Sequence, residues 1–261
     1  MSSLENRRVI LVDRPKGVPG PEFFALDKRA APQPGDGEFL VQNQFLSVEP
    51  AMRGWVNDAP NYSPPVPVGD VMRAFAVGKI IKSNNPNFKD GEIVSGLFGW
   101  QRYAVSDGSS VVTRMTNIDQ PQSYALGILG LNGITAYCGL IYQGEPKPNE
   151  TVVVSTAAGS VGSCVGQIAK IKGCRTVGIT GGPTKVQQCL DEFGYDVSID
   201  YKNTMDLGSA VAEACPDGVH VYFDNTCGLI SDAVMENLGM HARVIICGTS
   251  SVPDWIPLPT G

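Results

Sequence analysis

Two different patterns of apolar residues follow one another along the chain. Up to about residue 121, short apolar runs of β type are separated by turn residues such as Pro34-Gly35-Asp36-Gly37. This pattern is typical of a small antiparallel barrel or sandwich. A proline-rich stretch, residues 60–67, cannot lie inside a helix or a central strand and is predicted to be a loop. The strands are expected at residues 8–12, 39–48, 75–81, 93–98 and 101–105.

From residue 122 onward, strand-length and helix-length segments alternate. Residues 151–155 form a β-branched run, and the next segment places apolar residues at i, i+3, i+4, i+7 and i+8, which is the buried stripe of a helix. Five strands that alternate with helices predict a parallel, doubly wound sheet. Further strands are expected at 176–180, 197–200, 219–223 and 242–247, with helices over 186–193, 207–214 and 229–238 between them.

The turn after the first of these strands carries a dinucleotide-binding fingerprint. It reads Val154-Ser-Thr-Ala-Ala-Gly-Ser-Val-Gly162, with Ala157 in place of the first glycine. Gly159 would let the backbone approach a pyrophosphate, and Gly162 would let the helix pack closely on the strand. The strand before and the helix after supply the context that the motif requires. A glycine-rich turn that serves packing alone is the alternative.

The end of the second strand favours NADP over NAD. It reads Ile179-Thr-Gly-Gly182, without the carboxylate that usually holds the ribose of NAD. Lys185 follows closely, and a cation there would meet a 2′-phosphate. The alternative for Lys185 is an ordinary solvated helix residue.

Composition narrows the chemistry further. The chain has no Cys or His before Cys138, so the ligands of a catalytic zinc are missing from the first part and no metal site is expected. Seven cysteines without a C-x-x-C pair do not form a disulfide framework, and we expect them to be small buried thiols. Neither His220 nor His241 has a ligand or nucleophile at suitable spacing, so neither is given a catalytic role.

Charge and hydropathy limit the partners. Among 261 residues the formal net charge is -6, which argues against binding to nucleic acid or to an anionic membrane surface. The N-terminus lacks the apolar core of a secretory signal, and no run approaches the roughly 20 apolar residues of a membrane span. A cytoplasmic protein with a small-molecule partner is therefore expected.

Several longer stretches of the sequence, in addition to the fingerprint, match one known family in the same order. With them the chain resembles the zinc-independent medium-chain dehydrogenase/reductases, most of all the branch of prostaglandin reductases, leukotriene B4 12-hydroxydehydrogenase, plant alkenal double-bond reductases and bacterial curcumin reductases. The matching stretches include Leu46-Ser-Val-Glu-Pro-Ala-Met-Arg-Gly54, Ala59-Pro-Asn-Tyr-Ser-Pro-Pro-Val66, Gly130-Leu-Asn-Gly-Ile-Thr-Ala-Tyr137, Val165-Gly-Gln-Ile-Ala-Lys170 and Val221-Tyr-Phe-Asp-Asn225.

The resemblance implies both a fold and an activity. A GroES-like β-barrel domain that binds substrate would span residues 1–121, and a Rossmann NADP-binding domain would span residues 122–261. The family uses NADPH to reduce the carbon-carbon double bond of α,β-unsaturated ketones and aldehydes, such as 15-oxoprostaglandin-type or curcumin-type substrates. An NADPH quinone reductase and a non-catalytic NADPH-binding protein are the alternatives.

The resemblance also implies the site residues. Tyr62, on the proline-rich loop, would donate a hydrogen bond to the substrate carbonyl oxygen; a surface aromatic residue packed on its prolines is the alternative. Contacts to NADP(H) fall into four groups. They are the pyrophosphate loop (Ala158, Gly159, Ser160, Val161, Gly162), the adenosine end (Thr180, Gly181, Lys185, Tyr201), the nicotinamide half (Asn225, Cys247, Gly248) and the carboxamide (Thr135).

Three departures from the family are visible. Ala51 stands where many relatives have tyrosine, and residues 248–254 lack their Ser-x-Tyr-Asn. The sequence ends at Gly261, whereas family members continue, so we expect the Rossmann domain to be incomplete, with five strands of the six in the full form. The family is often dimeric, which implies a homodimer.

Overall fold

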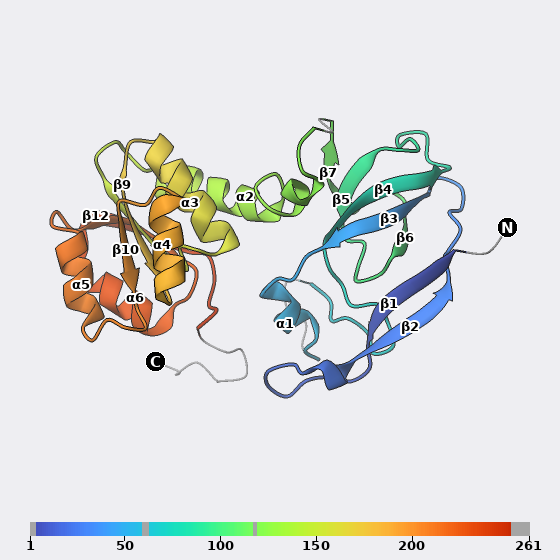
Figure 1. Cartoon of the computed structure of the whole chain (residues 1–261), viewed down its shortest axis with the longest axis horizontal. Helices are drawn as coiled ribbons and strands as arrows, with labels where there is room; N and C mark the ends of the chain where they lie inside the picture. Colours follow the sequence, from blue (N-terminus) through green and yellow to red (C-terminus); the bar gives the residue numbers. More distant parts are fainter. Residues whose placement is uncertain (1–3, 59–62, 117–118, 252–261) are drawn as a thin grey trace. The chain divides into compact units, whose positions relative to one another are not determined.

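The chain folds into two compact units, each with its own sheet and core. The computed structural model describes residues 4–58, 63–116 and 119–251. The units are Met1–Gly130 and Leu131–Gly261 (Figure 1). The family resemblance places the domain boundary at residue 121, and this boundary stays a prediction.

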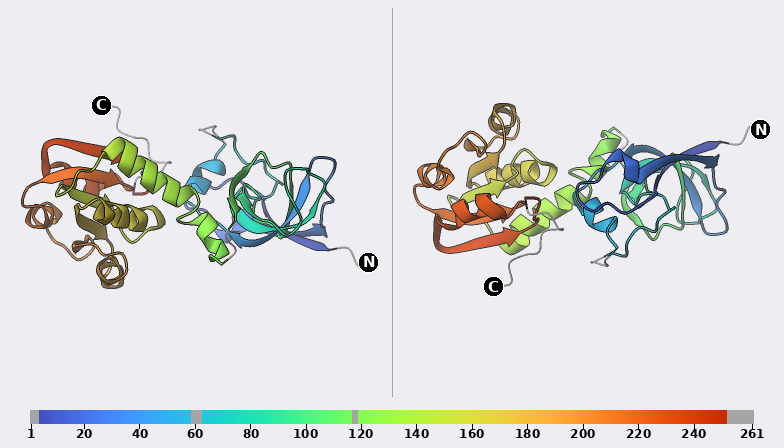
Figure 2. Two further views of the ribbon diagram at one scale, coloured as in Figure 1. Left: turned by 90° about the horizontal axis from the view of Figure 1, so that it is seen from above. Right: turned by 90° about the horizontal axis from the view of Figure 1, so that it is seen from below.

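The N-terminal unit is built from antiparallel strands that curl around a common interior (Figure 2). Its main sheet has the order β6-β3-β4-β5-β7, and β1 pairs with β2 in a separate ribbon. Asn6 joins the ribbon to the sheet, because its side chain donates to the Tyr103 carbonyl and accepts from the Tyr103 amide, both at 2.9 Å. The strands are β1 (Glu5–Leu11), β2 (Phe24–Ala30), β3 (Phe39–Leu46), β4 (Ala76–Ser83), β5 (Ile93–Gly96), β6 (Tyr103–Ser106) and β7 (Val111–Met115).

Short helical segments complete this unit. The described residues include α1 (Ala51–Trp55) and two 3-10 turns, η1 (Pro21–Phe23) and η2 (Gln122–Leu126). Ala125 of η2 packs with Val77 and Ile93, so η2 belongs with the β unit. The described part of the proline-rich stretch, residues 63–67, contains neither helix nor strand, as predicted.

The C-terminal unit is the doubly wound parallel sheet that the sequence predicts. Its order is β10-β9-β8-β11-β12, and all four pairings are parallel. The strands are β8 (Thr151–Ser155), β9 (Arg175–Thr180), β10 (Val197–Asp200), β11 (Val219–Asp224) and β12 (Leu238–Ile246). The helices are α2 (Leu131–Tyr137), the π-helix η3 (Cys138–Gly144), α3 (Ser160–Ile171), α4 (Pro183–Asp191), α5 (Leu207–Ala214) and α6 (Gly228–Met235).

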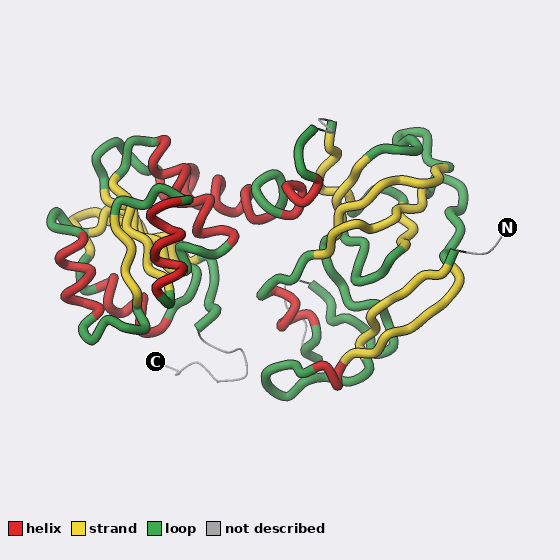
Figure 3. Tube along the Cα trace, viewed as in Figure 1, coloured by secondary structure: helices red, strands yellow, loops and turns green. Residues whose placement is uncertain are grey.

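Helices cover both faces of this sheet (Figure 3). Successive side chains of a strand point to opposite faces. Val152 and Val154 therefore pack under α2 and α3, whereas Val153 packs under α5 and α6. Burial on two faces explains why the strands are continuous apolar runs rather than alternating ones.

Several predicted boundaries differ from the structure, and the largest difference lies between the last helix and the last strand. The helix expected over residues 229–238 ends at Met235, and Leu238 already begins β12. Asn237 terminates the helix, because its side chain donates to the carbonyls of Ala233 (2.9 Å) and Gly208 (3.1 Å). Within the described ranges, no helix combines the length and the apolar character needed to cross a membrane.

Candidate dinucleotide site

The loops that carry the predicted cofactor residues leave the sheet at one edge. The register pairs Ser155 with Ile179, Asp200 with Thr180 and Asp224 with Ile246, so all five strands end at the same level. The chain runs from β8 to β9 and β10 on one side and returns to β11 on the other. Ligands of open α/β sheets bind at such a switch point, beyond the carboxyl ends of the strands.

The fingerprint turn joins β8 to α3. Its left-handed residue is Thr156, with φ of 53°, so the following Ala157 can replace a glycine without strain. The Gly159 amide donates to the Thr156 carbonyl at 2.8 Å and closes the turn. Gly159 occupies the N-cap position of α3 and has no side chain that could accept a hydrogen bond. The backbone amides of the first helical turn are therefore left to an external acceptor. This uncapped helix N-terminus fits a pyrophosphate.

Gly162 lies where α3 crosses the end of β8. A Cβ atom at this position would lie 2.3 Å from the Thr156 carbonyl oxygen. A Cβ atom at Gly178 of β9 would likewise lie 2.8 Å from the Ala157 Cβ. Small residues at both positions are therefore required for the helix to lie close to the strands, which is the role expected of the last fingerprint glycine.

The predicted adenosine residues gather at the ends of β9 and β10. The Tyr201 amide donates to the Thr180 carbonyl at 3.0 Å. A Cβ atom at Gly181 would lie 2.9 Å from Cε1 of Tyr201 and 3.0 Å from Cε of Lys202, so both side chains lie over this glycine. Lys185 is exposed in the first turn of α4.

Two further residues of this end were missed by sequence reasoning. Asp200 accepts hydrogen bonds from the Gly182 amide (2.8 Å) and the Lys202 amide (3.1 Å), and so joins the turns after β9 and β10. The Gly182 amide is the main cause of a lowered pKa of Asp200. Lys202 adds a second cation near the turn after β9, because its stem lies over Gly181. Their position in the sequence could have pointed to both residues, because they stand at the end of a predicted strand, and the ends of neighbouring parallel strands meet at one edge.

The predicted nicotinamide residues also come together. The Asn225 side-chain amide donates to the Ser155 carbonyl at 2.7 Å, and the Asn225 backbone amide donates to the Ser155 hydroxyl at 2.7 Å. The amides of Cys247 (2.7 Å) and Gly248 (3.1 Å) donate to the Asp224 carbonyl. The loops after β8, β11 and β12 are thereby tied into one structure.

Two predicted residues are not joined to this group. Thr135 is half-buried on α2, and the described contacts do not connect it with Asn225. Tyr62 lies outside the described residues.

The expectation that the cysteines are buried is only partly correct. Cys164, Cys174, Cys189 and Cys215 are buried, and burial raises the pKa of each thiol. Cys138 and Cys247 are exposed. Cys138 begins the π-helix η3, and Cys247 follows the last residue of β12, so neither lies in the apolar interior of the sheet.

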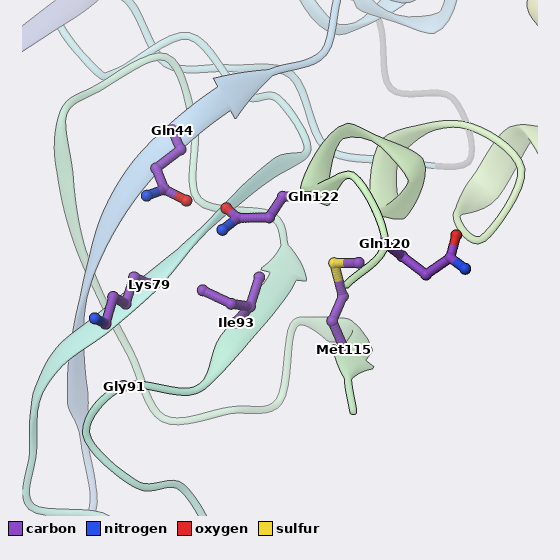
Figure 4. A pocket seen from close by; sticks show the side chains of 7 residues that line it. All are labelled: Gln44, Lys79, Gly91, Ile93, Met115, Gln120 and Gln122. Carbon is purple, nitrogen blue, oxygen red and sulfur yellow. The ribbon is translucent and has the colours of Figure 1, made fainter. Parts of the chain in front are cut away.

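A separate hollow of about 290 Å³ lies in the N-terminal unit (Figure 4). Oε1 of Gln122 is buried beside it and has no hydrogen-bond partner within the described chain. None of the predicted site residues lines this hollow. Its lining consists of Gln44, Lys79, Gly91, Ile93, Met115, Gln120 and Gln122.

Comparison with known protein families gives one match in each half of the chain. The family model "N-terminal domain of oxidoreductase" matches residues 7–113, and the model "Zinc-binding dehydrogenase" matches residues 160–260. Although the second description names zinc, the described residues contain no group of three or more His, Cys, Asp or Glu side chains placed to bind a metal.

Individual relatives match almost the whole chain. The NADPH-dependent curcumin reductase of Escherichia coli (strain K12) is 42% identical over 98% of this chain and 74% of its own length. Prostaglandin reductase 1 of Sus scrofa is 39% identical over 90% of this chain and 70% of its own. The structure of CurA in complex with NADPH from Vibrio vulnificus superimposes with a TM-score of 0.89 at 41% identity, covering 98% of this chain and 75% of that one. The chain therefore belongs to the zinc-independent medium-chain dehydrogenase/reductases, in the branch of the prostaglandin, alkenal and curcumin reductases.

Proposed function

We propose that the chain reduces the carbon-carbon double bond of α,β-unsaturated ketones and aldehydes with NADPH. The observation that carries the proposal is the edge of the parallel sheet. There, an uncapped α3 N-terminus lies beside the turn after β9, whose own residues Thr180-Gly-Gly182 include no carboxylate, on a fold that matches an NADPH complex at 41% identity. The relatives named for curcumin and prostaglandin reduction favour conjugated carbonyl substrates.

The chain's own residues would bind and orient the cofactor. The loop Ala158–Gly162 would hold the pyrophosphate through backbone amides, and Lys185 and Tyr201 would bracket the 2′-phosphate. Thr180 and Gly181 would line the adenosine ribose. When bound, NADPH supplies a hydride to the β-carbon of the conjugated carbonyl.

The remaining residues would position the reacting groups. Asn225 and the Cys247-Gly248 turn would lie along the nicotinamide half, and Thr135 would lie near its carboxamide. Tyr62 would donate a hydrogen bond to the substrate carbonyl oxygen, where negative charge develops as the hydride is transferred. Positioning of the two reactants and stabilisation of the developing oxyanion then matter more than a strong side-chain acid.

The proposal also covers the domains, the location and the oligomeric state of the protein. Residues 1–121 would form the substrate domain and residues 122–261 the NADP domain, in a cytoplasmic protein that forms homodimers. Sedimentation equilibrium tests the dimer. A single species at twice the mass of one chain supports it, and a monomer at micromolar concentration contradicts it.

The activity is tested by following the loss of NADPH absorbance with a panel of enones, enals and quinones, together with product analysis. A saturated ketone or aldehyde supports the proposal. A hydroquinone as the main product would instead assign the chain as a quinone reductase. Tight NADPH binding without turnover of any acceptor would leave a non-catalytic binding protein.

A further inference from the structure

Asp224, the last residue of β11, is a buried carboxylate at the cofactor edge, which is the edge of the parallel sheet where its five strands end. Its exposed fraction is 3%. Its hydrogen-bond partners in the described chain are all neutral. They are the hydroxyls of Ser155 (3.1 Å), Tyr222 (3.0 Å), Ser231 (2.5 Å) and Thr226 (3.3 Å), and the backbone amides of Thr226 and Cys227 (both 2.9 Å).

These donors keep the carboxylate ionised. Burial alone would raise the pKa of Asp224, but the Ser231 hydroxyl and the amides of Cys227 and Thr226 outweigh it, so the pKa lies below its usual 3.8. A buried charge without a cationic partner is costly and is uncommon in protein interiors. Its presence at this edge calls for a role beyond packing.

The carboxylate shapes the loop that follows β11. Its Oδ1 atom accepts from the amides of Thr226 and Cys227 together, which bends the chain so that Cys227 takes a left-handed φ of 59°. The Ser155 hydroxyl donates to the same oxygen and accepts from the Asn225 amide. Asn225 is thus held between β8 and β11.

The backbone of Asp224 extends this control to the loop after β12. Its carbonyl accepts from the amides of Cys247 and Gly248. Gly248 lies close to Asn225, since a Cβ atom at Gly248 would be 3.1 Å from the Asn225 carbonyl oxygen. All three residues expected along the nicotinamide half are therefore connected to Asp224: Cys247 and Gly248 directly, and Asn225 through Ser155.

Among the described residues, Asn225 keeps a side-chain acceptor available at this edge. The side-chain amide nitrogen of Asn225 is occupied by the Ser155 carbonyl, whereas within the described chain its Oδ1 atom accepts no hydrogen bond. The carboxamide of a nicotinamide ring carries an NH₂ donor that fits such an acceptor.

We propose that Asp224 is the positioning residue of the nicotinamide half: it fixes Asn225 and the Cys247-Gly248 turn so that Asn225 presents its Oδ1 atom to the carboxamide. Asp224 itself does not touch the cofactor. This inference rests on the proposed function, because it assumes that NADPH binds at this edge.

The test compares NADPH with 2′,5′-ADP, which contains the adenosine end and lacks the nicotinamide. For Asp224→Asn we expect turnover at saturating NADPH and affinity for NADPH to fall by about tenfold or more, with the Kd of 2′,5′-ADP changed less than about twofold. Asp232→Asn removes the same charge from an exposed position of α6 and is the control. It should behave as the wild type does.

A structural role alone would give a different pattern. If Asp224→Asn weakens NADPH and 2′,5′-ADP equally, or leaves turnover and both affinities unchanged, the inference is overturned. If that variant does not fold, Ser155→Ala decides, because it keeps the carboxylate and removes the hydroxyl between Asp224 and Asn225. The same split between the two ligands supports the inference, and a parallel loss overturns it.

The experiment also separates this inference from the proposed function. If the wild type binds both ligands and reduces no enone, the proposed reaction fails, and the affinities of Asp224→Asn still test the positioning role. If the wild type binds neither ligand, both proposals are wrong.

Discussion

Lys185 and Lys202 are the two cations near the turn after β9. Lys185→Ala should raise the Kd of NADPH by about tenfold, because a charge-assisted hydrogen bond to the 2′-phosphate is lost. The Kd of NADH, which has no such phosphate, should change little. Lys202→Ala should act in the same direction with a smaller effect, since only its stem is placed over Gly181.

Titration of cofactor fluorescence measures these affinities. Lys172→Ala is a suitable control, because this exposed lysine follows the C-terminal end of α3, away from the cofactor edge. Equal weakening of NADPH and NADH by Lys185→Ala would show that the 2′-phosphate lies elsewhere.

Gly162→Ala tests the close approach of α3 to β8. The added methyl group would lie 2.3 Å from a backbone carbonyl oxygen, so the helix must shift. We expect the free energy of unfolding to fall by about 1–3 kcal/mol. Urea denaturation measures it, with Gln167→Ala on the exposed face of α3 as the control. An unchanged midpoint for Gly162→Ala would contradict the packing described above.

At the scale of elements, Asp196 joins α3 to β9. It accepts from Lys170 at 2.6 Å and from the Thr176 amide at 2.8 Å. Burial raises the pKa of Asp196, but the hydrogen bonds from Lys170 and Thr176 prevail, and the net pKa is lowered from 3.8. A lowered folded-state pKa means that this carboxylate stabilises the fold above its unfolded-state pKa and loses that effect as the pH falls through the folded value.

Asp196→Asn should therefore destabilise the chain by about 1 kcal/mol at neutral pH, since the pair is partly exposed to solvent. The difference from the wild type should shrink as the pH falls below about 4. Chemical denaturation across this range measures it. A difference that stays constant down to acid pH would contradict the role of the ionised carboxylate.

The elements found from the sequence are those with a strong burial pattern. The strands of the parallel sheet are buried on two faces and stand out as apolar runs. The strand β2 was missed because it lies in a two-stranded ribbon and contains no buried residue. Even its Leu26 is exposed. The strand β7 has no fully buried residue, and the helix α1, with five residues, is too short for a periodic stripe.

The candidate site also has parts that could be predicted from the sequence and parts that could not. The fingerprint loop is local in sequence, so its turn and the helix after it could be predicted from nine residues. The contacts of Asp224 could not, because Ser155 lies 69 positions away and becomes a neighbour only when β8 pairs with β11. The position of Lys202 likewise depends on the pairing of β10 with β9.

At the scale of the whole molecule, NADPH should stabilise the fold. A ligand at 100 times its Kd adds about 2.7 kcal/mol to the stability of the form that binds it. For a chain of this length, that corresponds to a rise in Tm of about 5–10 °C. Thermal scans with equal concentrations of NADPH and NADH should give a clearly larger rise with NADPH. Equal shifts would contradict the preference for the 2′-phosphate.

The most direct test of the central claim follows the hydride itself. The chain is incubated with a conjugated enone and NADPH that carries deuterium at the transferred position, and the product is analysed by mass spectrometry and NMR. The account predicts a saturated ketone with one deuterium on the β-carbon. Deuterium on the carbonyl carbon of an allylic alcohol, or no deuterated product from any conjugated carbonyl, would contradict it.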